Sequence, residues 1–335
     1  MKSGPVSISD IARALNVSAS TVSRALKNHP DISLKTRRRV KEYAEQVHYR
    51  PNVLALGLKK QQSNTLGVII PEIVHHFFSS IISGVEDLAY GNGYRVMICQ
   101  SNEDYLREVI NLQALMDHRV DGLLVSISKS TLDTNHFLRV ADDGVPIVFL
   151  DRVCSDIPTD RVVTDDYEGA LMLVDHLISR GCRRIIHLYA SQHLTVGRER
   201  YAGYCQALEN AGIPVDENLV IHCDTPDRVA ARKEDILHAA KTADGLFAVN
   251  DFTAVAAMQM LREKGFGIPD DIAVGGFGDD PIATMVFPTL TTVEQKGYEM
   301  GYEAARLLIE RLRSVDSSEF KTKTFSAALK IRDSA

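Results

Sequence analysis

The chain has 335 residues and a formal net charge of −6 at pH 7, and this charge is unevenly distributed. Residues 1–60 contain twelve Lys and Arg against four Asp and Glu, so this segment carries +8 and the remaining residues carry −14. A basic segment on an acidic chain indicates contact with nucleic-acid phosphates. No apolar run reaches the roughly eighteen residues of a membrane span, and no apolar signal-peptide core follows Met1. We therefore expect a cytoplasmic protein that contacts DNA and no membrane.

Residues 1–50 are predicted to fold as three short helices. Ser7 and Asp10 have the spacing of a capping box, and the helix that they open carries apolar side chains at helical spacing up to Leu15. Ser18 caps a second helix after a short connection, and a third helix starts at Ser33. Two helices joined in this way predict a helix-turn-helix, whose second helix enters a DNA major groove. The outward-facing residues of that helix are Ala19, Ser20, Ser23 and Arg24.

The alternative interpretation of residues 1–50 is three ordinary amphipathic helices of a larger fold, because capping boxes are common in proteins. The charge separation between this segment and the rest of the chain disfavours that alternative. A single Arg among small outward side chains also suits base reading, since Arg offers two donors to one guanine.

Beyond residue 64, short apolar runs alternate with helical stretches. Such runs are typical of buried parallel strands, and helical stretches at residues 78–90 and 106–116 separate the first of them. The alternation predicts two doubly wound α/β lobes. The predicted strands are residues 66–70, 95–99, 122–125, 147–150, 184–189, 219–221, 245–249 and 272–276.

Residues that follow the predicted strands are candidate ligand contacts, because ligands of doubly wound sheets bind outside the carboxyl ends of strands. Aromatic rings cover the apolar faces of a sugar, while Arg, Asp and Asn hydrogen-bond its hydroxyl groups. A loop cap or an ion pair is the alternative for Asp151 and Asp251. The candidates are Phe77, Phe78, Asp151, Arg152, Arg200, Asn250, Asp251, Gly278 and Asp279.

A series of motifs extends over nearly the whole chain. They are Ser-Thr-Val-Ser-Arg-Ala-Leu at residues 20–26, Tyr-Arg-Pro-Asn at 49–52, Thr-Leu-Gly-Val-Ile-Ile-Pro at 65–71, Val-Asp-Gly at 120–122, Arg-x-Arg-x-x-Gly at 198–203, Asn-Asp at 250–251 and Leu-Thr-Thr at 290–292. In identity and order they resemble the lactose/galactose-repressor (LacI/GalR) family of transcription regulators.

The resemblance implies an α/β protein with an N-terminal helix-turn-helix domain at residues 1–50 and a hinge helix and linker at 51–64. An effector-binding and dimerisation domain similar to periplasmic sugar-binding proteins then occupies residues 65–335. By that analogy its N-lobe is formed by about 65–163 and 293–325, and its C-lobe by about 164–292 and 326–335.

The resemblance also implies how the chain contacts double-stranded operator DNA. Ala19 and Ser20 fall on base-reading positions, and Lys27 replaces an Asn that is common in the family. Residues 52–58 resemble the hinge helix that folds when a dimer grips its operator, with Leu58 wedged into the central minor-groove step. A plain interdomain linker is the alternative for this segment. The expected DNA contacts are Ala19, Ser20, Thr21, Ser23, Arg24, Lys27, Ser33, Thr36, Asn52, Ala55 and Leu58.

In the effector domain, the resemblance identifies Arg200 as an anchoring residue and Gln295 as a residue at the pocket edge. Gly278 stands where relatives often carry a ligand-binding Asp, so either Asp279 substitutes for it or the contact is lost. His75 and His76 replace a frequent Asn-Pro pair, and they are either solvated imidazoles or a pH-sensitive or anion-binding edge of the pocket. The expected effector contacts are Phe77, Phe78, Asp151, Arg200, Asn250, Asp251, Asp279 and Gln295.

No sequence feature indicates a cofactor, a metal site or catalysis. The five cysteines are scattered without a Cys-x-x-Cys pair, and no nucleophile with a partnered base emerges. We expect a homodimeric regulator, most simply a repressor, that responds to a sugar or sugar derivative; no apolar heptads indicate a coiled-coil tetramer. The alternatives are a family member controlled by a phosphorylated carrier protein, a sugar-binding module without a DNA function, and an enzyme of the α/β class.

Overall fold

The computed structural model describes residues 6–49, 63–314 and 319–335. They fall into two compact units, Met1–Ser63 and Asn64–Ala335, and each unit is described by itself. The expected hinge contacts Asn52, Ala55 and Leu58 lie outside the described residues. Within the described ranges, no helix has both the length and the apolar character needed to cross a membrane.

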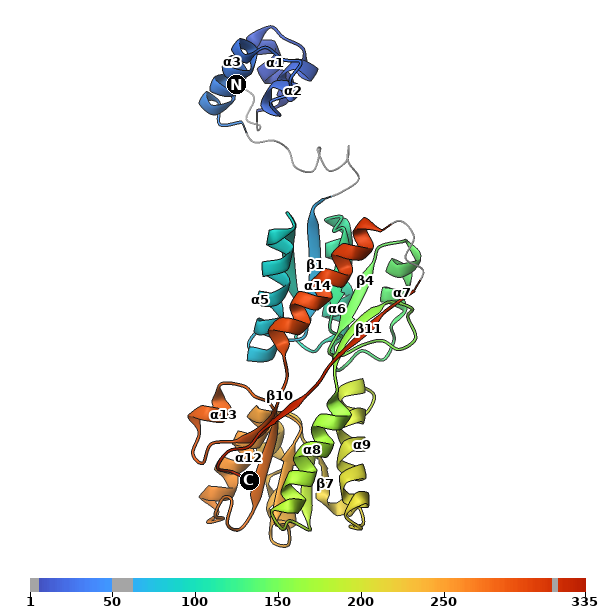
Figure 1. Cartoon of the computed structure of the whole chain (residues 1–335), viewed down its shortest axis with the longest axis vertical. Helices are drawn as coiled ribbons and strands as arrows, with labels where there is room; N and C mark the ends of the chain where they lie inside the picture. Colours follow the sequence, from blue (N-terminus) through green and yellow to red (C-terminus); the bar gives the residue numbers. More distant parts are fainter. Residues whose placement is uncertain (1–5, 50–62, 315–318) are drawn as a thin grey trace. The chain divides into compact units, whose positions relative to one another are not determined.

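Within residues 6–49 of the first unit there are three helices (Figure 1), and a serine hydroxyl caps each of them. Ser7 caps α1 within a capping box, Ser18 accepts a hydrogen bond from the backbone N–H of Thr21 at 3.0 Å, and Ser33 caps α3 in the same way. A cap of this kind stabilises a helix by about 1 kcal/mol. Buried Ile11, Val22 and other apolar side chains hold the helices together. The helices are α1 (Ile8–Leu15), α2 (Ala19–Leu26) and α3 (Leu34–Gln46).

The second unit contains two six-stranded sheets with the same strand order. The order is β2-β1-β3-β4-β5-β11 in the first sheet and β7-β6-β8-β9-β10-β12 in the second, and all neighbours are parallel except β10 and β12. The first sheet comprises β1 (Thr65–Ile70), β2 (Arg95–Gln100), β3 (Gly122–Val125), β4 (Ile147–Leu150), β5 (Asp160–Thr164) and β11 (Thr322–Phe325). The second comprises β6 (Ile185–Tyr189), β7 (Val220–His222), β8 (Gly245–Ala248), β9 (Ala273–Gly278), β10 (Thr291–Glu294) and β12 (Ala328–Lys330).

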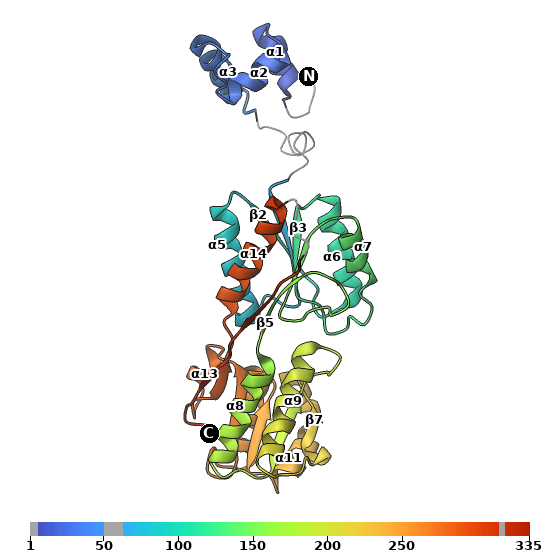
Figure 2. The same ribbon diagram turned by 45° about the vertical axis from the view of Figure 1, so that its right-hand side comes forward.

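Helices cover both faces of each sheet, as expected for buried parallel strands (Figure 2). In the first lobe α5 and α14 pack on one face, while α6 and α7 pack on the other. In the second lobe α8 and α9 pack on one face, and α10, α11 and α12 pack on the other. The helices are α5 (His76–Gly91), α6 (Tyr105–Asp117), α7 (Asn135–Asp142), α8 (Asp166–Ser179), α9 (Thr195–Asn210), α10 (Pro226–Ala231), α11 (Lys233–Ala240), α12 (Asp251–Glu263), α13 (Ile282–Met285) and α14 (Gly297–Arg313).

The chain passes between the two lobes three times. It leaves the first sheet after β5, returns from β10 into α14, and crosses again between β11 and β12. The strand order reverses at the equivalent place in each sheet. The reversal lies between β1 and β3 in the first sheet and between β6 and β8 in the second. The carboxyl ends of strands at such a switch point are where open α/β sheets bind ligands. The architecture confirms the expected helix-turn-helix followed by a two-lobed α/β fold.

Candidate functional site

A cavity of about 160 Å³ lies between the two lobes, at the carboxyl ends of strands from both sheets. It is lined by aromatic rings together with acidic and basic side chains, a mixture that suits a small polar ligand. Six of the expected contacts meet there, and two do not. Those in the lining are Phe77, Phe78, Asp151, Arg200, Asn250 and Gln295; those outside it are Asp251 and Asp279.

Arg200 is fixed in the second lobe by three neighbours. From α9 its Nε donates to Oδ1 of Asp166 at 2.8 Å, and its Nη1 donates to the Val249 carbonyl at 2.6 Å. The guanidinium carbon lies 3.7 Å from the ring centroid of Phe277, so the cation stacks on an aromatic face. Burial raises the pKa of Asp166, and the positive charge of Arg200 opposes that rise. Arg200 is thus held in one orientation and retains further N–H donors for a ligand.

Asp151 and Arg152 follow β4 in the first lobe. Burial raises the pKa of Asp151 to about 6, against the opposing effect of Arg152. Nη1 of Arg152 contacts both carboxylate oxygens of Glu103, at 2.8 and 2.9 Å. Burial favours the neutral form of Glu103, but Arg152 and the N–H of Lys129 outweigh it and lower the pKa of Glu103. Fixed charges of both signs therefore line this side of the cavity.

Asn250 and Asp251 are adjacent in sequence but have different surroundings. Asn250 lines the cavity, caps α12 and donates to the Asp224 carbonyl at 2.9 Å. The Asp251 carboxylate is fully buried and accepts hydrogen bonds from the Thr292 hydroxyl and from the backbone N–H of Asp280. Burial raises the pKa of Asp251 to about 7. Its side chain connects α12 to β10 and to the loop after β9, and does not face the cavity.

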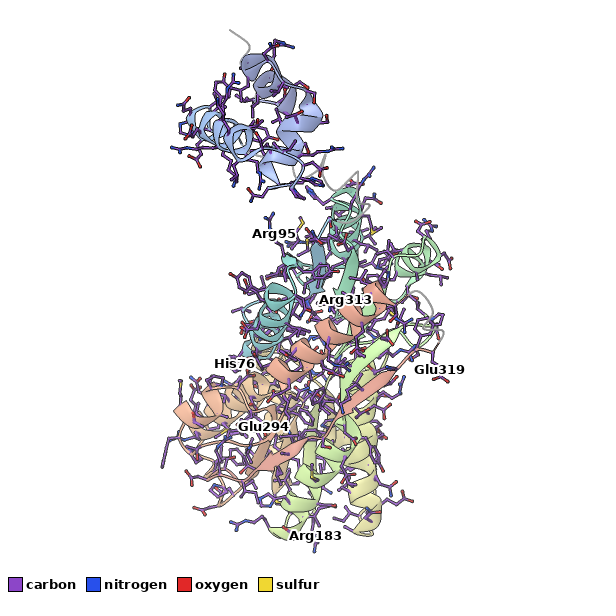
Figure 3. All side chains as sticks on the ribbon, turned by 45° about the horizontal axis from the view of Figure 1, so that its top comes forward. His76, Arg95, Arg183, Glu294, Arg313 and Glu319 are labelled. Carbon is purple, nitrogen blue, oxygen red and sulfur yellow. The ribbon has the colours of Figure 1, made fainter. Side chains whose placement is uncertain are left out.

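His75 precedes α5 and His76 is its first residue, and His76 lies in the region of the first lobe that faces the second (Figure 3). His75 lines the cavity, its Nε2 lies 2.8 Å from Oε2 of Glu72, and its ring meets the Phe252 ring edge-on at 5.5 Å. Nδ1 of His76 is 3.9 Å from Oδ1 of Asp280 in the second lobe. The two imidazoles therefore lie close to acidic groups and to the opposite lobe.

Several lining residues were absent from the sequence prediction. Glu103 and Lys129 follow β2 and β3, while Asp224 and Thr225 follow β7, so the rule of strand ends could have identified them. Asp166, which holds Arg200, was also not predicted as a site residue; it follows Asp165, the cap of α8, and is buried. Its contact with Arg200 joins residues 34 positions apart, which no local pattern indicates. The polar and aromatic lining residues missed were Glu72, Glu103, Lys129, Asp224, Thr225, Phe252, Phe277 and Asp280.

The second helix of the first unit presents the expected DNA contacts. Ala19, Ser20 and Arg24 are exposed, and Lys27 follows at the end of the helix. The Ser18 hydroxyl lies 2.7 Å from that of Ser20 and also within hydrogen-bond distance of Thr21, so these groups are preoriented. Nη1 of Arg24 is 3.9 Å from the exposed carboxylate of Asp31, a contact that solvent weakens.

Ser33 and Thr36 are paired at the start of α3. Their hydroxyl oxygens are 2.9 Å apart, and Ser33 also accepts from the Thr36 backbone N–H. Thr21 and Ser23 of α2 are partly buried, whereas Ser33 is exposed. Hydroxyl groups around a helix start can donate to phosphate without reading sequence. The arrangement is compatible with the expected backbone contacts.

Comparisons with known proteins agree with both units. Residues 7–52 match the family of bacterial regulatory proteins, lacI family, and residues 174–335 match the periplasmic binding protein-like domain. The chain is 33% identical to the HTH-type transcriptional regulator DegA of Bacillus subtilis (strain 168), over 89% of each chain. It is 32% identical to the ribose operon repressor of Halalkalibacterium halodurans, over 95% of this chain and 94% of the relative.

Solved structures show the same architecture. The transcriptional regulator CelR in complex with cellobiose matches with a TM-score of 0.74 at 27% identity, over 98% of this chain and 100% of that chain. The lac repressor dimer bound to operator and the anti-inducer ONPF matches with a TM-score of 0.84 at 24% identity, over 99% of both chains, and shows the fold. A helix-turn-helix unit with a two-lobed cleft defines a class of transcription regulators that combine DNA and ligand binding. Within that class, this chain belongs to the lacI family of bacterial regulatory proteins.

Proposed function

We propose that this regulator is a repressor whose operator affinity changes when a sugar or sugar derivative binds between the two lobes. The observation that carries the proposal is the convergence of Arg200, Asn250 and Asp151 on one cavity together with the rings of Phe77 and Phe78. These groups come from both lobes, so a ligand that contacts all of them favours one angle between the lobes.

Relatives with bound sugars support the choice of ligand class. CelR was solved with cellobiose, and a LacI family regulator from Enterococcus faecium, with a TM-score of 0.71 and 27% identity, was solved with bound ribose. The latter match covers 81% of this chain and 98% of that chain. Cation, carboxylate and amide groups beside aromatic rings suit the hydroxyl groups and apolar faces of such sugars.

For DNA binding we propose that Ala19, Ser20 and Arg24 face base edges, while Thr21, Ser23, Lys27, Ser33 and Thr36 contact the backbone. One recognition helix reads one half-site, so a homodimer reads a near-palindrome. Asn52, Ala55 and Leu58 remain proposed hinge contacts outside the described residues. We also propose that the effector domain comprises residues 65–335. The protein acts in the cytoplasm, where bacterial operator DNA is found.

The test is a thermal-shift screen of the full chain against D-ribose, D-xylose, D-glucose and cellobiose. A sugar at about one hundred times its Kd stabilises the protein by about 2.7 kcal/mol and raises the Tm of the effector domain. Arg200→Lys keeps a positive charge beside Asp166 but loses the planar fork, so we expect its sugar affinity to fall about tenfold or more.

Arg183→Lys is the matched control for this screen. Arg183 precedes β6 at the amino end of the second sheet, away from the first lobe (Figure 3). We expect its response to sugar to equal that of the wild type. A wild-type protein that responds to none of the sugars would contradict the ligand class, and an unaltered response of Arg200→Lys would contradict the site.

A further inference from the structure

The last residue of β9 is a glycine, Gly278, where relatives often carry an acidic side chain. Gly278 has a φ of +139°, which disfavours residues with a Cβ atom, and it lines the cavity without offering a polar side chain. The next residue, Asp279, has a φ of +54° and accepts a hydrogen bond from Nη2 of Arg332 at 2.6 Å. Arg332 also donates to the Leu290 carbonyl at 2.8 Å, which fixes its position. Asp279 is therefore engaged outside the cavity.

Asp280 reaches the cavity instead. Its side chain is only 9% exposed, and its main chain is held by a 2.8 Å hydrogen bond from its N–H to Oδ2 of Asp251. Among the described residues, no group hydrogen-bonds to its buried Oδ1. His76 across the cleft is 3.9 Å away, beyond hydrogen-bond distance. Asp280 thus carries a buried acceptor that lacks a donor at the edge of the ligand cavity.

The position of this carboxylate compensates for the glycine. A Cβ atom added to Gly278 would lie 3.3 Å from Oδ2 of Asp280. The Asp280 carboxylate therefore lies directly beside the place where a side chain at position 278 would start. An unpartnered buried acceptor costs stability unless a ligand or water supplies a donor. Burial also raises the pKa of Asp280, while His76 and His75 oppose the rise.

We propose that Asp280, rather than Asp279, is the acidic residue through which the second lobe accepts a hydrogen bond from a hydroxyl group of an uncharged ligand. The inference rests on the proposed function, because it concerns the same cleft. His75 and Phe77 of the first lobe line the same cavity. A hydroxyl held by Asp280 therefore belongs to a ligand that bridges the two lobes.

The charges of the lining favour an uncharged ligand over a phosphorylated one. Five carboxylates line the cavity, against three permanently positive side chains. Arg152 and Arg200 are already paired with Glu103 and Asp166, and the positive charge of Lys129 helps to lower the pKa of Glu103. The carboxylates are Glu72, Glu103, Asp151, Asp224 and Asp280, and the cations are Lys129, Arg152 and Arg200. An added phosphate would meet this excess of negative charge.

The test compares the full-length wild type, Asp280→Asn and Asp279→Asn by calorimetric titration with D-ribose, D-xylose, D-glucose, cellobiose and ribose 5-phosphate. We expect Asp280→Asn to lose about tenfold or more in affinity for any sugar that binds the wild type, since a charged acceptor is replaced by a neutral one. Asp279→Asn should keep the wild-type affinity, and the phosphate ester should bind more weakly than ribose. Equal affinities of Asp280→Asn and wild type, or loss in Asp279→Asn alone, would overturn the assignment.

Urea unfolding without sugar tests Asp280 independently of the ligand. If Oδ1 of Asp280 awaits a ligand, Asp280→Asn should unfold at the same or a higher urea concentration than wild type, because no native hydrogen bond is lost. Asp279→Asn should unfold at a lower concentration, because its ion pair with Arg332 is weakened. A loss of stability in Asp280→Asn as large as that in Asp279→Asn would show a structural role and overturn the proposal. If no sugar binds the wild type, the proposed function fails, and this unfolding comparison still decides the role of Asp280.

Discussion

Arg200 and Asp251 illustrate two uses of buried charge in the second lobe. Arg200 pairs with Asp166 and stacks on Phe277, yet it remains part of the cavity lining. Asp251 accepts its hydrogen bonds from Thr292 and from the backbone of Asp280, and it faces the interior. The first arrangement fixes the orientation of the Arg200 guanidinium at the cavity, where we propose that it donates to the ligand. The second fixes the loop from which Asp280 reaches the cavity.

The buried Asp251 predicts a pH dependence of stability. Its pKa is raised from 3.8 to about 7 on folding, so the folded protein holds a proton that the unfolded chain releases between these values. The contribution of Asp251 to the free energy of unfolding therefore decreases as the pH rises from about 4 to 7, and is constant above that range. Asp251→Asn does not titrate, and its amide can donate to Thr292 while accepting from Asp280.

Urea unfolding of wild type and Asp251→Asn at several pH values between about 5 and 8 measures this contribution. We expect the wild type to lose stability relative to the variant as the pH rises across this interval. Parallel pH profiles for the two proteins would show that Asp251 is already charged in the folded protein at the lower pH, in contradiction to the prediction.

Single residues show what the sequence could predict about the cavity. Phe77, Arg200 and Asn250 follow strands, and the switch in strand order brings those strand ends together. Asp251 follows Asn250 directly, but the orientation of α12 about its axis points the Asp251 side chain inward. The position of a residue after a strand does not predict this orientation. Asp280 was missed because the acidic contact was expected at 279, whereas the left-handed backbone of that residue turns its side chain toward Arg332.

In the proposed function, sequence-specific DNA binding depends on helix α2. Its buried side chains Val22 and Ala25 pack against the other two helices, so Ala19, Ser20 and Arg24 remain at the surface. The Ser18 cap and its hydroxyl contacts fix the first turn. Ala19 and Ser20 have small side chains. Arg24 is therefore the long exposed side chain of α2 that can donate two hydrogen bonds to one guanine.

Arg24→Ala should weaken operator binding by about 1–3 kcal/mol, roughly 5- to 150-fold, with a much smaller effect on random DNA. Fluorescence anisotropy at fixed salt measures both affinities, with an operator selected from random duplexes. Arg38→Ala is the matched control, because Arg38 is an exposed Arg of α3 that pairs with Glu42. Equal losses on operator and random DNA would identify Arg24 as a phosphate contact and contradict the base-reading role.

Among the strands, the continuous apolar runs were predictable, and the strands with polar residues were not. All eight predicted runs contain strands, because both faces of a parallel strand are covered and its sequence is continuously apolar. Strands β5, β10, β11 and β12 were not predicted as strands. Polar residues interrupt the apolar pattern of β5 and β10. Strands β11 and β12 are four and three residues long at sheet edges, and β11 is largely exposed and polar. Their identity as strands comes from pairing with β5 and β10, which are distant in sequence.

In the proposed function the two units provide DNA binding and ligand binding, and the second unit couples them. We propose that the three crossings between lobes, after β5, β10 and β11, bend when the angle of the cleft changes. Helix α14 starts directly after the second crossing and packs against α5, which carries His76 and the two Phe residues of the cavity. In this proposal, a ligand between the lobes acts on α5 and α14. These helices contribute to the core of the first lobe, which follows the proposed hinge in sequence.

The most direct test is the operator affinity of the full-length protein with and without a saturating concentration of the sugar found in the thermal-shift screen. At fixed salt, we expect the sugar to change the Kd for operator by about tenfold or more in the wild type, which corresponds to a coupling free energy of at least 1.4 kcal/mol. At the same sugar concentration, Arg200→Lys should show a smaller change. An operator affinity of the wild type that is the same with and without bound sugar would contradict a sugar-controlled regulator.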